Sequence, residues 1–164
     1  MGKKRRHKGL SFLVLISLFS CGNKEGFDEQ KAISKEGLTP KAIVFEVPAQ
    51  ELNNSPQNLF IWLRNNPEYE FSNIFLIATL KVNNEIYIQD TLEYAMTAPD
   101  GSWLGKGFTE LKENKLWWKE GLVIPQEGPV QIEIAQAMRN NGKPEGVPKL
   151  KGIVSLGISI EDQQ

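Results

Sequence analysis

Cysteine and histidine are almost absent from this sequence of 164 residues, since each occurs once, as Cys21 and His7. Both belong to the amino-terminal segment, which is basic and then apolar. If residues 1–20 are removed, no histidine remains and the single cysteine becomes the first residue. This excludes structural disulfides, zinc sites built from Cys and His, and catalysis by an imidazole or a free thiolate. Only carboxylate, hydroxyl and lysine chemistry remains for the mature chain.

An excess of positive charge is also missing from the main part of the chain. The first twenty residues contain five basic side chains and no acidic one, so removing them leaves 14 basic against 20 acidic side chains, a net charge of −6. Such a surface repels phosphate backbones, and no basic stripe with interleaved aromatic residues follows residue 20. We therefore expect no nucleic-acid partner.

Long apolar runs are limited to one segment near the amino terminus. Residues 2–8 form a cationic block, and residues 10–19 form a largely apolar run of ten. Ten helical residues span about 15 Å, roughly half of a bilayer core, so this run is too short for a permanent transmembrane helix. The arrangement predicts a removable signal peptide over residues 1–20, with its basic end on the cytoplasmic side.

The end of this segment resembles the bacterial lipobox. It reads Leu18, Phe19, Ser20 and Cys21, with a leucine three places before the cysteine and a small residue just before it, although Phe19 is larger than usual. The resemblance implies cleavage before Cys21 and a covalent lipid on its thiol, the only non-protein group that we expect. Two or three acyl chains anchor stably, because each buried CH2 contributes ~0.8 kcal/mol. The alternative, a buried free cysteine, has no amphipathic segment after it to pack against.

The residues after Cys21 predict which membrane holds the protein and how far the folded domain can lie from it. Gly22 and Asn23 provide no aspartate next to Cys21, which favours the outer membrane over the inner membrane of the cell envelope. Residues 22–40 are charged, contain three glycines and show no sustained apolar period. We therefore predict a flexible tether over residues 21–40, with a reach of at most about 60 Å, and a folded domain over residues 41–164.

Period-two alternation of apolar residues dominates the predicted domain, which indicates β-strands separated by turns. Residues 59–63 are apolar on both faces and predict a central strand, and residues 116–124 predict a strand that ends at Pro125. The pattern predicts an all-β fold: a single antiparallel β-sandwich, jelly-roll or Ig-like, of about seven to eight strands. The predicted inward faces are Ile43, Phe45 and Val47; Leu59, Ile61 and Leu63; Ile74, Leu76, Ala78, Leu80 and Val82; Ile86, Ile88, Leu92 and Tyr94; Val130, Ile132 and Ile134; and Val154, Leu156, Ile158 and Ile160.

One predicted hairpin carries two local signals. Asn83 and Asn84 predict a tight turn because asparagine tolerates positive φ. Asp90 interrupts the otherwise apolar inward face of the strand that follows.

The loop at residues 97–108 is the first candidate interaction site, with Asp100, Trp103 and Lys106 as its candidate residues. Pro99, Asp100 and Gly101 predict a turn. The loop lacks the spacing and the following helix of a phosphate-binding P-loop. Two interpretations remain open: Trp103 fastens the loop into the end of the sandwich, or the loop binds a partner.

Trp117 and Trp118 are the second candidate site. Neighbouring residues of a strand point to opposite faces, so one of the two rings is expected in the core and the other outside. An exposed ring can stack on a sugar or anchor an interface, although partial burial alone is the commoner explanation. Asp100 with Glu110, or Glu113 with Glu120, resembles a glycosidase pair only by chance spacing.

Several segments together resemble the GldH family of gliding-motility lipoproteins. They are SNIFLIATL at residues 72–80, DTLEYAMTAPDGSWLGKGFTELKENKLWWKE at 90–120, and IEIAQAMRNNGKPEGVPKLKGIVSLGISIE at 132–161. The resemblance covers roughly residues 40–161 and includes the lipobox. It implies a cell-envelope lipoprotein of gliding bacteria that supports surface motility and associates with the machinery that exports adhesins. It brings no catalytic residues.

We therefore expect a lipid-anchored, noncatalytic accessory that contacts other gliding or secretion proteins. The rival from a binding class is a carbohydrate-binding sandwich that uses Trp103, Trp117 or Trp118. The rival from an enzyme class is a glycan hydrolase, which needs two carboxylates about 5 to 10 Å apart in a cleft.

Overall fold

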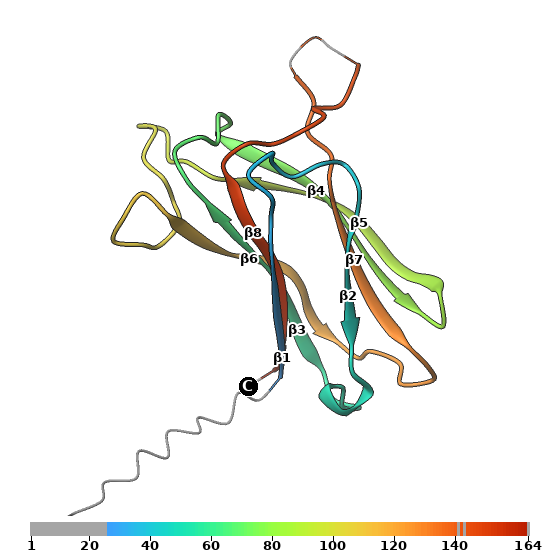
Figure 1. The fold of residues 1–164 in the computed structure, drawn as a ribbon. Coiled ribbons are helices and arrows are strands. Elements are labelled where there is room, and N and C mark those ends of the chain that lie inside the picture. Colours follow the sequence, from blue (N-terminus) through green and yellow to red (C-terminus); the bar gives the residue numbers. More distant parts are fainter. Residues whose placement is uncertain (1–25, 141, 143, 164) are drawn as a thin grey trace, which may run out of the picture.

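The computed structural model describes residues 26–140, 142 and 144–163, which fold into two facing antiparallel sheets of four strands each (Figure 1). The described residues contain one 3-10 turn, Ala49–Glu51, and no α-helix. None of their helical segments has the length and hydropathy of a transmembrane span. The strands are β1 (Phe27–Ala32), β2 (Ile43–Val47), β3 (Gln57–Asn65), β4 (Asn73–Val82), β5 (Glu85–Ala95), β6 (Lys112–Leu122), β7 (Val130–Gln136) and β8 (Ile153–Asp162).

The strand order identifies the type of sandwich. One sheet has the order β1-β8-β3-β6 and the other β2-β7-β4-β5. Successive strands therefore cross from one sheet to the other, except that β4 and β5 pair as a hairpin. This is the double Greek-key order of a jelly roll. The predicted all-β sandwich is confirmed, and the jelly roll replaces the Ig-like alternative.

The core lies between the sheets and consists largely of the predicted inward residues. Leu59, Ile61 and Leu63 of β3 are fully buried, and so are Leu76 and Leu80 of β4. β3 lies between β8 and β6, as predicted from its two apolar faces. Alternation thus locates the core correctly because one face of each sheet must leave water.

The inward facing predicted for two residues, Ile86 and Val154, is wrong because of register shifts. Ile86 is 59% exposed, because β5 pairs Ile88 with Leu80 and Ile86 with Lys81, leaving Tyr87 as an extra residue. Val154 is half-buried, because a similar irregularity in β8 turns Ile153 inward. One inserted residue reverses the facing of the residues beyond it, so strict alternation is wrong at these two strand ends.

The tight turn predicted at Asn83 and Asn84 is confirmed between β4 and β5. Asn83 and Asn84 have φ angles of 53° and 64°. Two successive positive φ values characterise the two-residue turn that suits the twist of paired strands.

The predicted tether is wrong for residues 27–40. Phe27–Ala32 forms β1 and pairs with β8, and Leu38 is buried in a bridge to Leu150. Local sequence hides this strand because residues 28–31 are all polar, so no apolar alternation appears, and because its pairing partner lies over a hundred residues away. Residues 1–25, which include the predicted signal peptide and Cys21, lie outside the described residues.

Two of the glycines that suggested a tether instead allow close packing. Gly26 and Gly37 have φ angles of 120° and 105°. A Cβ on Gly26 would lie 2.1 Å from the Ile160 carbonyl oxygen, and one on Gly37 would lie 2.6 Å from that of Leu150. Only glycine permits both the backbone angle and the approach.

Candidate functional site

The predicted loop at residues 97–108 follows the carboxyl end of β5 and begins with a tight turn. The Gly101 amide donates to the Ala98 carbonyl at 2.9 Å, and the Ala98 amide donates to the Ser102 carbonyl at 2.8 Å. The Asp100 carboxylate accepts bonds from the Ser102 hydroxyl at 2.6 Å and from the Ser102 amide at 2.9 Å. These bonds lower the pKa of Asp100. Asp100 therefore stabilises its own turn.

Trp103 lies half-buried against the edge of the core. Its ring centroid is 6.2 Å from that of Tyr69, and its backbone bridges Thr97. Tyr69 is buried and its hydroxyl donates to the Asn73 carbonyl, and burial raises the pKa of this phenol. Trp103 therefore lies where its ring can hold the loop against the end of the sandwich, although part of the ring is exposed.

Lys106 lies in the next turn of the loop, apart from the Asp100 turn. Its backbone exchanges two hydrogen bonds of 2.8 Å with Glu113, and its side chain is exposed. These bonds close a small hairpin with Phe108 at its tip, and Lys112 Nζ donates to the Gly107 carbonyl at 2.9 Å. Phe108 is fully exposed, and Leu104 and Leu111 are also exposed. We call these three residues the apolar tip; sequence reasoning missed it because loop position alone does not show exposure.

Trp117 and Trp118 point to opposite faces of β6, as predicted. Trp118 is buried, and its Nε1 donates to Asp90 Oδ2 at 2.9 Å. Trp117 is 47% exposed and meets Phe60 edge to face, with centroids 4.7 Å apart. Trp118 is therefore excluded as an exposed platform, whereas Trp117 remains accessible.

Asp90, which interrupts the apolar face of β5, connects the two sheets. Besides the bond from Trp118, it forms an ion pair of 3.0 Å with Lys119 of β6. Burial by itself would raise the pKa of Asp90, but the bonds from Trp118 and Lys119 outweigh it and hold the pKa below its ordinary value. The interruption in the apolar pattern was the sequence signal of this contact, but its partner was not predictable.

Tyr94 adds a second bond between the same two edge strands. Its hydroxyl donates to the Trp117 carbonyl at 2.6 Å. Burial, with a smaller effect of Asp90, raises the pKa of Tyr94 to about 12. The donor hydroxyl therefore persists throughout the neutral range.

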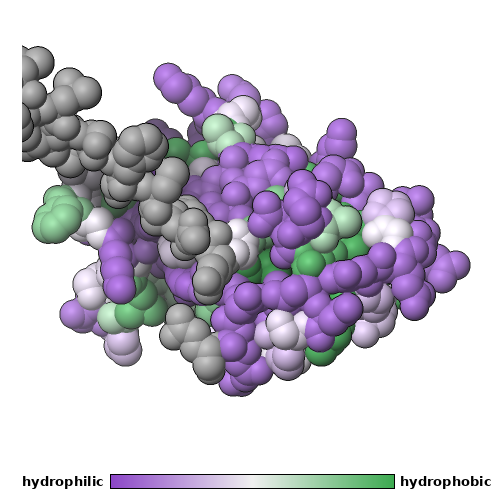
Figure 2. All heavy atoms as spheres, turned by 90° about the horizontal axis from the view of Figure 1, so that it is seen from below, coloured by the Kyte–Doolittle hydropathy of each residue, from purple (hydrophilic) through white to green (hydrophobic). Residues whose placement is uncertain are grey.

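The outer face of the sheet β1-β8-β3-β6 carries a hollow with a volume of about 980 Å³. Its lining is largely polar and comes from all four strands. We call the following residues the Trp62 face: Gln30, Asn58, Trp62, Arg64, Glu113 and Glu161. Seen from the end at which β1 begins, the molecular surface is mostly hydrophilic, with smaller apolar patches (Figure 2).

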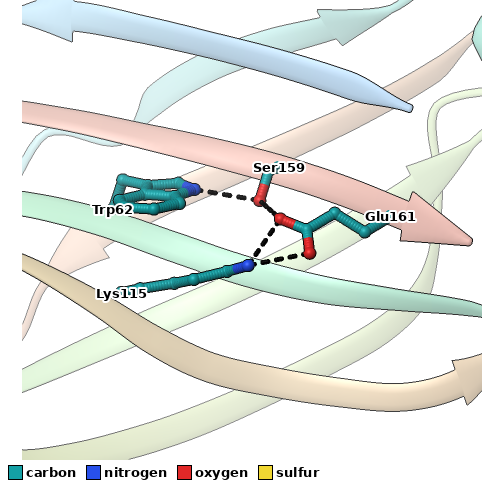
Figure 3. A network of polar contacts seen from close by, with 4 residues as sticks. All are labelled: Trp62, Lys115, Ser159 and Glu161. Atoms are coloured by element: carbon teal, nitrogen blue, oxygen red, sulfur yellow. Dashed lines mark hydrogen bonds and ion pairs between the residues drawn. The ribbon is translucent and has the colours of Figure 1, made fainter. Parts of the chain in front are cut away.

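A polar network crosses three strands of this face (Figure 3). Trp62 Nε1 donates to Ser159 Oγ at 2.9 Å, and Ser159 Oγ donates to Glu161 Oε1 at 3.0 Å. Lys115 Nζ contacts both Glu161 oxygens, at 2.6 and 2.7 Å, and lies 5.4 Å from the Trp62 ring centroid. The orientation of the indole is therefore set by bonds from a neighbouring strand.

Comparison with known proteins gives the family. A family model described as GldH lipoprotein matches residues 27–160. The gliding motility lipoprotein GldH of Flavobacterium johnsoniae is 38% identical over 158 residues, which cover 96% of this chain and 98% of that protein. A GldH homolog of Christiangramia forsetii is 42% identical over 151 residues, 92% of each chain. This chain belongs to the GldH lipoprotein family.

The GldH match begins at the first residue of β1 and ends within β8, so it covers the whole sandwich. The family resemblance seen in the sequence is thus confirmed, and membership in a lipoprotein family supports a membrane-anchored position in the cell envelope. Among solved structures, the crystal structure of dimeric latent PorU from Porphyromonas gingivalis aligns with a TM-score of 0.32 and 11% identity, over 84% of this chain and 13% of PorU. That similarity is too low to inform function.

The predicted carboxylate pair of Glu113 and Glu120 does not have the spacing that a glycosidase needs. Glu113 and Glu120 both belong to β6, where seven residue steps along the strand place them roughly 23 Å apart, beyond the roughly 5 to 9.5 Å of such pairs. Glu113 is instead paired with Arg64. Within the described ranges, no three Asp, Glu, His or Cys side chains gather as metal ligands.

Proposed function

We propose that this GldH-family protein is a noncatalytic accessory of the gliding-motility machinery, or of the associated secretion machinery, that acts by contact with another protein. We further propose that a lipid on Cys21 anchors it, with the outer membrane favoured. The names of the two relatives support the motility role. The observation that supports protein contact is the apolar tip.

The apolar tip has the features of an interface anchor. Phe108 is fully exposed at the end of a hairpin that two backbone bonds hold in place. Aromatic residues are enriched where protein interfaces are buried, and exposed apolar clusters on soluble domains mark interaction sites. Burying a Phe side chain contributes about 1.5 to 3 kcal/mol, which gives the tip a driving force for docking.

The position of the tip relative to the anchor favours a protein over the anchoring membrane as its target. β1 begins at one end of the sandwich, and the loop before β6 lies at the other end, shown in yellow in Figure 1. Since β1 starts at Phe27, the five steps from Cys21 to Gly26 reach at most about 17 Å, far less than the predicted 60 Å tether. The end with β1 is therefore held near the lipid, and the tip faces away.

A photo-crosslinking side chain placed at position 108 tests the contact in living cells. We expect a specific crosslinked protein at position 108 and none at position 87, where Tyr87 is also exposed but lies at the other end of β5. Loss of motility in Phe108→Ala, at unchanged protein level, would support the same conclusion. Equal crosslinking at both positions, or full motility of Phe108→Ala, would contradict it.

Metabolic labelling with a fatty acid tests the anchor separately. Cys21→Ser should lose the label and keep its signal peptide, because the hydroxyl does not accept the thioether-linked lipid. The sandwich begins at residue 27 and should still fold. Label retained on the serine variant would place the lipid elsewhere.

A further inference from the structure

We infer that the Trp62 face is a second binding site, separate from the apolar tip, and that its ligand is a neutral glycan chain. The site lies on the outer face of the sheet β1-β8-β3-β6, whereas the tip lies in the loop before β6. The inference does not depend on the proposed motility role.

The shape of the face comes from small residues along β8. Ser155, Gly157 and Ser159 alternate with the core residues of that strand, so they point outward, but larger neighbours cover them, and Ser155 and Ser159 are only 9% and 2% exposed. Larger side chains flank them, Gln30 from β1 and Trp62 from β3. A Cβ on Gly157 would lie 2.5 Å from Gln30 Cγ. Gln30 therefore covers Gly157, whereas Ser159 lines the hollow, whose volume of about 980 Å³ falls within the roughly 300 to 1,000 Å³ of ligand sites.

The aromatic component of the site is Trp62, which lies half-buried in the lining of the hollow. The bond from its Nε1 to Ser159 Oγ restrains the ring before any ligand arrives. A restrained ring loses little conformational entropy on binding, and an indole offers a large apolar surface to the C–H face of a pyranose.

The polar component consists of two accessible ion pairs. Arg64 Nε lies 2.5 Å from Glu113 Oε2, and Lys115 Nζ lies 2.6 Å from Glu161 Oε1, with side chains between 34% and 42% exposed. Arginine carries five N–H donors and each carboxylate accepts several bonds, so both pairs retain capacity for a ligand. Sugar hydroxyls donate and accept, and this alternation of donors and acceptors suits them.

The charge of the lining disfavours an anionic ligand. The hollow is lined by five carboxylates and one cation: Asp28, Glu113, Glu120, Glu161, Asp162 and Arg64. Glu113 and Glu161 each have a cation beside them, and Asp162 accepts bonds from two side-chain amides, so these carboxylates are already engaged before a basic peptide arrives. An added peptide strand would also need a free sheet edge, whereas this site lies on a sheet face. The side-chain amides of Gln30 and Asn58 can both donate hydrogen bonds to sugar hydroxyls and accept them.

Affinity electrophoresis tests this assignment with the full chain in a detergent that has no sugar head group. The gels would contain a neutral β-glucan, a neutral mannan, a xylan or the anionic polysaccharide alginate, and a fluorescent poly-lysine peptide would be titrated in solution. We expect retardation by at least one neutral glycan. Trp62→Ala should bind at least about tenfold more weakly, which corresponds to 1.4 kcal/mol.

Matched variants separate binding from folding. The double variant Arg64→Gln/Glu113→Gln replaces an exposed pair and should fold normally while binding several-fold more weakly. Phe108→Ala should bind like the unaltered protein, since the tip is outside the site. Three results would overturn the inference: no neutral glycan retards the protein, the Trp62→Ala and double variants are retarded as strongly as the unaltered protein, or the protein binds only poly-lysine or alginate. None of these results bears on crosslinking at position 108.

Discussion

The interior of the sandwich and the apolar tip use similar side chains in opposite ways. Leu59, Ile61 and Leu63 are fully buried between the sheets, whereas Leu104 and Phe108 are exposed on a loop. Interior residues contribute free energy to folding, because they leave water when the sheets pack. Tip residues contribute nothing of this kind until a partner covers them. Substitutions in the two regions should therefore separate stability from function.

Trp118→Ala should show the largest effect on stability. Trp118 is buried and donates to Asp90, so its removal should lower the free energy of unfolding by about 3 to 5 kcal/mol. Denaturant titration measures this, with Trp117→Ala as the neighbouring control. The control should lose only about 1 kcal/mol, mostly its contact with Phe60. Equal losses would contradict the assignment of the two rings to interior and exterior.

Trp103→Ala should have an intermediate effect. The ring is half-buried beside Tyr69, so we expect a loss of roughly 2 kcal/mol, about half of the cost for a fully buried tryptophan. The same titration gives the value. An unchanged unfolding midpoint would show that Trp103 does not fasten the loop.

Asp90→Asn should have a smaller effect that depends on pH. The amide keeps one acceptor for Trp118 but loses the charge beside Lys119, at a cost of about 1 kcal/mol near pH 7. Because the folded pKa of Asp90 lies below its ordinary value of 3.8, its stabilisation is complete above that value and is lost as the pH falls through the folded pKa. The free energies of unfolding of Asp90→Asn and of the unaltered protein should thus become equal in strong acid. Between pH 6 and 8 they should differ by an amount that does not depend on pH. A difference that grows in acid would contradict this.

Phe108→Ala should have the smallest effect on stability. The side chain is fully exposed, so the free energy of unfolding should change by no more than about 0.5 kcal/mol. Partner crosslinking from a neighbouring tip position, such as 104, should nevertheless decrease. A large destabilisation would place Phe108 in the fold, and the comparison between interior and tip would fail.

Much of the fold was predictable, but the candidate sites were less so. Alternation predicted the inward residues of β2, β3, β4 and β7, since burial of one face leaves a local period of two. It could not predict β1, which gains its hydrogen bonds from β8 at the far end of the chain. Sequence patterns singled out Trp103 and Trp117, but they missed Trp62, whose place on a hollow face depends on residues from three other strands.

The sequence by itself determined the all-β class, the positions of most strands, the Asn83–Asn84 turn and the family. These features depend on local periodicity, on backbone preferences of single residues and on motifs that are continuous in the chain. Only the tertiary structure decided the jelly-roll strand order, the inclusion of residues 27–40 in the sandwich and the ion-pair partners of Asp90 and Arg64. The reason is that pairing in this fold joins strands that are distant in sequence, and neither partner carries a local mark of the other.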